Sequence, residues 1–176
     1  MAKETEQGLG TPLRFEADPE TKRKKGAYRP VFADVFTLPG ASPAKIEKVH
    51  LLVNPFAGKK RGRAVAAQVV ELVERAGIEI TVSYSAYSGH LVTMASALEV
   101  GDHDIIAVVG GDGSLSEAIT GRMLLNGKRT ETFAIVPAGT GNSQAHDLRL
   151  GTPEEAVEAM LNGRRQALDL ARVELT

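Results

Sequence analysis

The chain has 176 residues and no cysteine, and 43% of its residues are hydrophobic and 24% charged. This composition predicts one soluble globular domain with a real core, and the lack of cysteine excludes disulfides and thiolate metal sites. The formal net charge of −1 argues against a dedicated nucleic-acid-binding protein. No apolar run is long enough to span a bilayer, and the N-terminal MAKETEQGLG lacks the layout of a secretory signal, so we expect a cytoplasmic protein.

The first part of the chain differs in composition from the rest. Residues 1–42 are polar and rich in glycine and proline, which predicts a flexible N-terminal arm before a domain at residues 43–176. The run Lys22–Lys25 suits peripheral contact with an anionic membrane, but nearby acidic residues favour a solvated tail. A short strand at residues 29–36 is the one element we expect in this arm.

From Lys48 onward, short apolar or alternating runs predict strands, and amphipathic or capped stretches predict helices. The predicted elements are, in chain order, strand 49–53, helix 63–76, strand 78–84, helix 90–100, strand 104–109, helix 114–125, strand 132–136, helix 152–163 and strand 166–173. This alternation predicts a three-layer α/β/α fold around a mostly parallel sheet. Right-handed crossovers then bring every strand-to-helix turn to the same edge of the sheet.

Several helix ends carry capping signals. Ser114 and Glu117 match the S-x-x-E capping box, and Ser88 precedes the helix predicted at residues 90–100. Thr152, followed by proline and by a glutamate three residues later, predicts a capped start for the last helix.

Three turns at the predicted edge are rich in glycine. They are Asn54-Pro55-Phe56-Ala57-Gly58, Gly110-Gly111-Asp112-Gly113 and Pro137-Ala138-Gly139-Thr140-Gly141-Asn142. Glycine lets a backbone approach a ligand closely, and helix N-termini offer free N–H groups, so together these turns suit phosphate. Four cations add positive charge after the first turn: Lys59, Lys60, Arg61 and Arg63.

Asp112 is the unusual member of these turns. A carboxylate beside phosphate is repelled unless it holds a divalent cation or accepts a proton from an attacking hydroxyl, and both tasks belong to phosphoryl transfer. One Asp-Gly turn alone is more often simply a turn. Neither the P-loop pattern nor G-x-G-x-x-G with its downstream acid is present, so the three turns together carry the prediction.

In this order and spacing the three turns, with Glu117 after the second, resemble the signature loops of the diacylglycerol kinase catalytic domain family. That family includes sphingosine kinases, ceramide kinases and bacterial lipid kinases. The resemblance covers about Val49 to Val173, and it implies a nucleotide-binding domain of the NAD kinase-like fold. It also implies an enzyme that uses ATP and Mg²⁺ to phosphorylate a lipid hydroxyl, on diacylglycerol or a sphingoid base.

The resemblance implies roles for individual residues. Asp112 would be the general base or would organise Mg²⁺. The residues implied to surround the nucleotide are Asn54, Gly58, Lys59, Lys60, Ser85, Gly110, Gly111, Gly113, Glu117, Gly139, Thr140, Gly141 and Asn142. Ser85 matches a hydroxyl residue on the adenine side. His90 and Asp169 also match family positions. A lone histidine at a helix start is more often structural, and for Asp169 a structural hydrogen-bonding role at the end of a strand is an equal alternative.

The sequence departs from the family pattern in two places. Ser143 stands where many diacylglycerol kinases have aspartate, which is closer to the sphingosine-kinase-like branch and leaves the lipid open. Family enzymes continue into a second, β-rich lipid-binding domain, which we expect this chain to lack. The chain would then be a truncated or degenerate member that binds nucleotide weakly and lacks useful kinase activity. Its exposed docking face would favour association, for example as a homodimer.

Two other interpretations remain open at this point. An NAD kinase-like enzyme would explain the GGDG turn but not the first or third turn. A non-catalytic, flavodoxin-like domain would use the same turns to hold phosphate or a nucleotide without transferring it.

Overall fold

The computed structural model describes residues 42–43, 45–125, 131–165, 167 and 170, and the structural statements below concern these residues. The predicted N-terminal arm, its strand at residues 29–36 and most of the predicted strand at residues 166–173, Asp169 included, lie outside them. The proposed domain boundary therefore stays a prediction.

The predicted parallel sheet is confirmed. Four strands pair in parallel in the order β3-β2-β4-β5. Their bounds are β2 Lys48–Val53, β3 Glu79–Tyr84, β4 Asp104–Gly110 and β5 Thr132–Pro137. A separate pair of two-residue strands, β1 (Ser42–Pro43) and β6 (Arg164–Arg165), is antiparallel.

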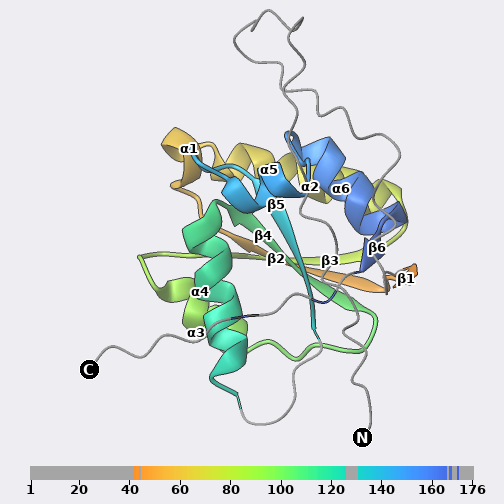
Figure 1. Cartoon of the computed structure of the whole chain (residues 1–176), viewed down its shortest axis with the longest axis horizontal. Helices are drawn as coiled ribbons and strands as arrows, with labels where there is room; N and C mark the ends of the chain where they lie inside the picture. The colour runs from red at the N-terminus through yellow and green to blue at the C-terminus, as the bar shows by residue number, and fades with distance from the viewer. Residues whose placement is uncertain (1–41, 44, 126–130, 166, 168–169, 171–176) are drawn as a thin grey trace, which may run out of the picture. The chain divides into compact units, whose positions relative to one another are not determined.

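Helices cover both faces of this sheet, so the layered α/β fold is confirmed (Figure 1). The helix bounds are α1 Ala57–Lys60, α2 Gly62–Arg75, α3 His90–Ser96, α4 Asp112–Met123, α5 Ser143–Asp147 and α6 Pro153–Asn162. Helices α2 and α6 pack on one face, where they share a hydrophobic core with the strands. Helices α3 and α4 enclose a second, smaller core on the other face.

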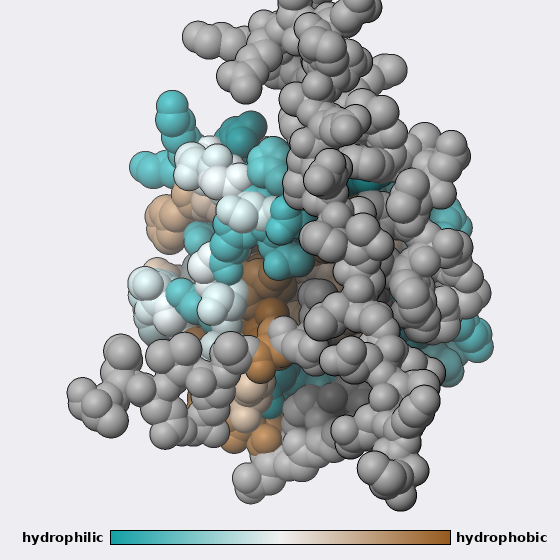
Figure 2. All heavy atoms as spheres, viewed as in Figure 1, coloured by the Kyte–Doolittle hydropathy of each residue, from teal (hydrophilic) through white to brown (hydrophobic). Residues whose placement is uncertain are grey.

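The two central strands, β2 and β4, are buried by the helices on both faces of the sheet. Every residue of β2 after Lys48 and every residue of β4 after Asp104 is buried, as expected for parallel strands covered on both faces. The edge strand β3 is more exposed. In Figure 2, hydrophilic side chains gather at the upper left of the coloured surface, around α1 and α5, and hydrophobic ones lie deeper, beside α4. Among the described residues, none of the helices combines the length and apolarity needed to cross a bilayer.

The predicted capping box at Ser114 and Glu117 is wrong. Helix α4 begins at Asp112, and its N-cap is Gly111, whose extended backbone (φ −118°, ψ −168°) ends the turn two residues earlier than predicted. Ser114 therefore lies inside the first turn, and its hydroxyl accepts a hydrogen bond from Asn54 instead. No side chain caps α4.

The predicted cap at Ser88 is also wrong. The N-cap of α3 is Gly89, with φ +85°, and no side chain caps it. Helix α3 ends at Ser96, shorter than the predicted helix that reached Val100.

The predicted start of the last helix is confirmed. At α6, Thr152 Oγ1 accepts a hydrogen bond from the Glu155 amide at 3.1 Å, and Glu155 Oε2 accepts one from the Thr152 amide at 3.1 Å. Gly77 follows α2 with φ +75°, the left-handed conformation common after a helix.

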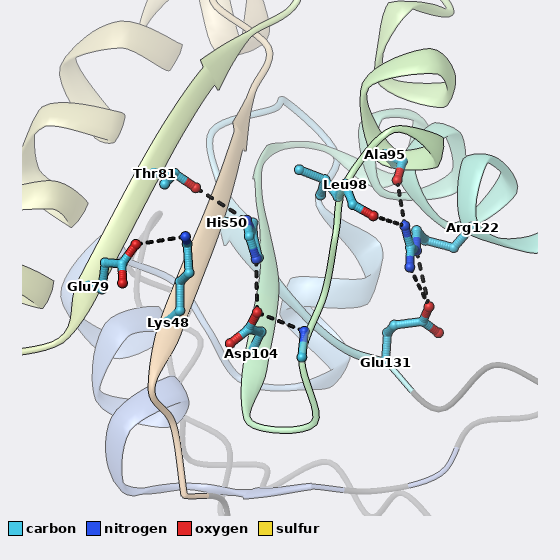
Figure 3. A network of polar contacts seen from close by, with 10 residues as sticks. Lys48, His50, Glu79, Thr81, Ala95, Leu98, Asp104, Arg122 and Glu131 are labelled. Atoms are coloured by element: carbon cyan, nitrogen blue, oxygen red, sulfur yellow. Dashed lines mark hydrogen bonds and ion pairs between the residues drawn. The ribbon is translucent and has the colours of Figure 1, made fainter.

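A buried arginine joins α3 to α4 (Figure 3). Arg122 Nη1 donates to the carbonyls of Ala95 and Leu98 at 3.0 and 2.8 Å, which satisfies two acceptors at the end of α3. Its Nε and Nη2 donate to Glu131 Oε1 at 3.1 and 2.7 Å. This arginine therefore fixes the helical layer that carries one wall of the site described below.

A second polar network lies at the opposite edge of the sheet from the glycine turns (Figure 3). His50 Nε2 donates to Asp104 Oδ2 at 3.1 Å, and Thr81 Oγ1 lies 3.2 Å from His50 Nδ1. Burial favours the neutral acid of Asp104, but hydrogen bonds from the Gly101 amide and from His50 hold its pKa below the ordinary value. This network ties β2 to its two neighbouring strands.

Candidate active site

The three glycine turns meet at the carboxyl edge of the sheet, as the alternation of elements predicts. They enclose an open cleft of about 410 Å³. Its lining residues are Asn54, Ala57, Gly58, Gly111, Asp112, Gly113, Ser114, Glu117, Gly139, Thr140, Gly141 and Asn142. Nine of the predicted nucleotide-binding residues and Asp112 are thus brought together.

The first and third turns touch through their backbones. A Cβ added to Gly58 would lie 1.8 Å from the carbonyl oxygen of Ala138, so only glycine allows this approach. Gly58 also has φ +54°, in the left-handed region. Gly58 therefore closes the cleft at the side where α1 meets β5.

The second and third turns touch in the same way. A Cβ on Gly139 would lie 2.9 Å from the Cα of Gly111, and one on Gly110 would lie 2.5 Å from the side chain of Ser114. By contrast, a Cβ on Gly113 would meet nothing within 4 Å. Gly58 and Gly139 are thus the glycines that let the turns pack on one another, and the space around Gly113 is open to a ligand.

Asn54 links the first turn to the second. Its Oδ1 accepts a hydrogen bond from the Phe56 amide at 3.0 Å, and its Nδ2 donates to Ser114 Oγ at 3.2 Å. The hydroxyl of Ser114 is buried beside the cleft. The sequence analysis missed this role because the S-x-x-E spacing had already explained Ser114 as a cap.

Asp112 joins the second turn to the third. Its Oδ1 accepts a hydrogen bond from the Gln144 amide and its Oδ2 one from the Ser143 amide, each at 2.9 Å. These two amides, that of Gln144 most of all, hold the pKa of the Asp112 carboxyl below its ordinary value. Asp112 is therefore an anion that already fixes the start of α5, and its affinity for a proton is reduced.

The N-terminus of α4 points into this cleft without a side-chain cap. Free N–H groups and the positive end of the helix dipole favour an anion at such a position. The cleft thus combines a helix N-terminus with one carboxylate held close to it, an arrangement suited to a phosphate and a cation together.

Asn142 starts α5 in a left-handed conformation, with φ +53°. Its Nδ2 donates to the carbonyl of Gly139 at 2.9 Å, which closes the third turn on itself. Its Oδ1 is buried and has no hydrogen-bond partner among the residues that the structure describes. Left-handed asparagine and an unpaired buried acceptor both cost stability, and such costs gather at functional sites.

A smaller pocket of about 240 Å³ adjoins the cleft, with Asn54 and Glu117 in the walls of both. Its other lining residues are Phe56, Ser85, Tyr87, Ser88 and Leu91. Glu117 Oε1 accepts a hydrogen bond from the Gly89 amide at 3.0 Å, so it holds the loop that carries Ser85. The sequence analysis placed Ser85 near the nucleotide but missed the aromatic residues around it.

His90 has a structural part in that loop. Its Nδ1 accepts a hydrogen bond from the Ala86 amide at 3.0 Å, and its ring stacks on Tyr87 with the centroids 4.6 Å apart. His90 does not line either of the two pockets. The alternative of a structural histidine is thus the one that the contacts favour.

Four predicted nucleotide-binding residues lie outside the lining of the larger cleft, and one of them, Ser85, lines the smaller pocket instead. Gly110 is buried behind the larger cleft, beneath Ser114, and Lys59 and Lys60 are exposed in α1. Within the described ranges, no cluster of three or more histidine, aspartate or glutamate side chains has the arrangement of a metal site. A cation in this cleft would rely on Asp112 and on the ligand's own oxygens.

Residues 48–173 match the model of the diacylglycerol kinase catalytic domain. The chain belongs to this family. It is 31% identical over 143 residues to sphingosine kinase B of Dictyostelium discoideum, a match that covers 78% of this chain and 18% of the relative. It is 27% identical over 132 residues to the diacylglycerol kinase of Bacillus subtilis, covering 73% of this chain and 42% of the relative.

The fold agrees with this membership. A crystal structure of a diacylglycerol kinase from Bacillus anthracis superposes with a TM-score of 0.53 at 29% identity, over 67% of this chain and 42% of that one. The parallel sheet and its helices are thus those of the diacylglycerol kinase catalytic domain. The chain spans less than half the length of each of these relatives.

Proposed function

We propose that this chain is the nucleotide-binding part of an ATP-dependent lipid kinase. The observation that carries the proposal is the cleft in which an uncapped helix N-terminus and Asp112 face the space beside Gly113. Membership of the diacylglycerol kinase catalytic domain family supports the same reaction. The acceptor would be the hydroxyl of diacylglycerol or of a sphingoid base, because relatives named for each match this chain.

In this proposal, the nucleotide phosphates bind the amides at the start of α4 and the third turn, Gly139–Asn142. The smaller pocket takes the nucleoside, with Ser85 and Tyr87 in its wall. Glu117 belongs to both pockets and positions the Ser85 loop through the Gly89 amide. These contacts would align the terminal phosphate at the open end of the cleft.

Asp112 fits a Mg²⁺ ion that is also bound by phosphates. Magnesium in nucleotide sites commonly uses one or two carboxylates, with phosphate oxygens and water as its other ligands. The cation would neutralise charge on the phosphates during transfer. The lowered pKa of Asp112 makes it a weak proton acceptor and a good cation ligand, so we assign it the second of the two roles predicted from the sequence.

The reaction needs few groups from the protein. The lipid hydroxyl oxygen bonds to the terminal phosphorus, the bond from that phosphorus to its bridging oxygen breaks, and ADP leaves while the hydroxyl proton passes to a base. Phosphoryl transfer depends mainly on positioning and on stabilising charge. The three interlocked turns supply both.

A domain that binds the nucleotide without transferring phosphate is the alternative function. The hydrogen bonds that both oxygens of Asp112 already accept from the Ser143 and Gln144 amides favour it, because they give this carboxylate a structural role. A measurement of lipid phosphorylation distinguishes the kinase from the non-catalytic nucleotide-binding domain. Homodimer formation and the contribution of a second domain stay predictions.

The test is transfer of labelled phosphate from ATP to diacylglycerol or sphingosine in detergent micelles, with the chain as the only protein. We expect label in the lipid, lost in Asp112→Asn. The variant Gly111→Val should weaken ATP binding, because its side chain would enter the space between the second and third turns. Mg²⁺-dependent ATP binding without any lipid phosphorylation would favour the non-catalytic alternative.

A further inference from the structure

Helix α5 has few means of holding its own shape. It follows the third turn directly (Figure 1) and has five residues, little more than one helical turn. Helices this short are marginal in water without support from outside. The N-cap of α5, Asn142, makes no side-chain cap hydrogen bond, and Ala145 is the one buried residue of the helix. The stability of α5 therefore depends on contacts with other parts of the chain.

Asp112 supplies such a contact. Its two oxygens accept the amides of Ser143 and Gln144, each at 2.9 Å, and these are the first two amides of α5. The first amides of a helix have no acceptor within the helix itself. Asp112 lies 31 positions before Ser143 in the chain, so a carboxylate of the second turn acts as the N-cap of α5.

The backbone on both sides of α5 has unfavourable angles. Asn142 precedes the helix with φ +53°, and Arg149 follows it with φ +61°. Asparagine tolerates this left-handed region, but arginine does not. Within the described residues, Asn142 Oδ1 is also buried without a hydrogen-bond partner. These costs are present while α5 is in place, so they narrow the free-energy gap between an ordered α5 and a loosened one.

The carboxylate that holds α5 is the one to which we assign the cation. An ionised carboxylate has about four lone-pair positions, and two of those of Asp112 are occupied by amide hydrogens. A cation on the same carboxylate draws its negative charge away from the amides and repels their partly positive hydrogens. A cation and the start of α5 therefore compete for Asp112.

Any loosening of α5 would stay local. Before it, Ala138 is fully buried at the end of β5. After it, Thr152 begins α6 with a complete capping box. The third turn, Gly139–Asn142, lies between Ala138 and α5, so a change at the start of α5 reaches this turn directly.

We propose that Asp112 and the first two amides of α5 form a latch that a cation opens. In the empty cleft, Asp112 holds the start of α5 and keeps the third turn fixed against the second. When Asp112 binds a cation, α5 loosens and the third turn is free to adjust to the phosphates of the ligand. The inference rests on the proposed function in one respect, because it takes Asp112 as the cation ligand.

The test is NMR measurement of backbone amide exchange in the whole chain with Mg²⁺ and inorganic triphosphate. Triphosphate supplies phosphate oxygens for the cation without a nucleoside or a lipid. The reporters are the amides of His146, Leu148 and Leu150, which donate to carbonyls of residues 142–145. We expect them to exchange about tenfold faster, the factor that one hydrogen bond to a charged group corresponds to. Amides of α6 should be unaffected, and triphosphate without Mg²⁺ should leave α5 unchanged.

A variant of α5 provides the reciprocal measurement. If cation binding loosens α5, then loosening α5 must strengthen cation binding by the same factor. Ala145→Gly loosens the helix without touching Asp112, so it should bind Mg²⁺–triphosphate up to about fivefold more tightly in calorimetry, the factor by which a helix prefers alanine to glycine. The matched control is Ala156→Gly in α6, because the two alanines are 0% and 1% exposed. This control should leave the affinity unchanged.

Asp112→Asn tests the other half of the latch. Its amide nitrogen cannot accept a hydrogen bond, so α5 should exchange fast without any cation and should not respond to Mg²⁺–triphosphate. If this variant does not fold, the affinity of Ala145→Gly decides the matter, since a purely structural α5 gives equal or weaker binding there.

Several results would overturn the latch. They are slower or unchanged exchange of α5 in Mg²⁺–triphosphate, the same response in Asp112→Asn, and no binding of Mg²⁺–triphosphate to the natural chain. Binding at Asp112 without any change in α5 would remove the latch and leave the proposed function standing. Because the assay contains neither nucleoside nor lipid, failure of the proposed kinase reaction would not change its outcome.

Discussion

Gly58 offers the sharpest test of how the cleft is built. An alanine Cβ there would lie 1.8 Å from the Ala138 carbonyl oxygen, 1.6 Å less than the 3.4 Å at which ordinary contacts begin. Its φ of +54° adds a cost of about 1–2 kcal/mol for a residue with a Cβ. Forcing extra atoms into a packed contact typically costs about 1–3 kcal/mol. Gly58→Ala should therefore lower the free energy of unfolding by about 2–5 kcal/mol.

Gly113 provides the matched control, because it lies in the same cleft and takes the same substitution. A Cβ there meets nothing within 4 Å, and the residue belongs to helix α4. Gly113→Ala should raise the free energy of unfolding by about 0.5–1 kcal/mol, the usual gain over glycine in a helix. Urea unfolding of the two variants measures both values. Changes of the same sign, or a loss below about 0.5 kcal/mol for Gly58→Ala, would refute the account of interlocked turns.

Three further predictions follow from single contacts. Arg122→Leu should cost about 3–5 kcal/mol in urea unfolding, because it removes the charged partner seen in the ion pair with the buried Glu131 carboxylate and two hydrogen bonds to carbonyls at the end of α3. A loss under about 1 kcal/mol would contradict this. Asp112→Asn should have a lower free energy of unfolding than the natural chain at neutral pH. This difference should vanish as acid protonates Asp112, because the pKa of Asp112 is lower in the folded state than in the unfolded state. A difference that stays constant down to about pH 2 would exclude that linkage. Thr152→Ala should cost about 1 kcal/mol by loss of the capping box, and an unchanged midpoint in urea would argue against it.

The parallel sheet and the edge where the glycine turns lie could be predicted from the sequence, because both follow from simple hydrophobic patterns. Buried apolar runs such as residues 49–53 and 104–109 have few alternatives to a covered parallel strand, and parallel strands bring their carboxyl ends together. The three glycine turns are therefore expected at the same edge of the sheet. The N-cap at Thr152 could also be predicted, because it depends on residues only three positions apart.

The missed features depend on contacts between distant residues. Ser114 matched a local capping pattern, yet its hydroxyl bonds to Asn54, 60 positions earlier in the chain. Helix α5 is only five residues long and its first amides bond to Asp112, so no local periodicity announces it. Lys59 and Lys60 have left-handed backbone angles, with φ +62° and +69°, which lysine disfavours. At functional sites, tertiary contacts often override local sequence preferences, and Ser114 and the start of α5 are two such cases.

The central claim is that the three turns form one site for nucleotide phosphates. It is tested most directly by titrating the isotope-labelled chain with ATP, with and without Mg²⁺, while following its backbone amide NMR signals. We expect saturable, Mg²⁺-dependent shifts at residues 111–114 and 139–144, with smaller shifts at Ser85 and its loop, and no shifts with NAD at equal concentration. Absence of binding at millimolar ATP, or shifts confined to residues away from these turns, would contradict it.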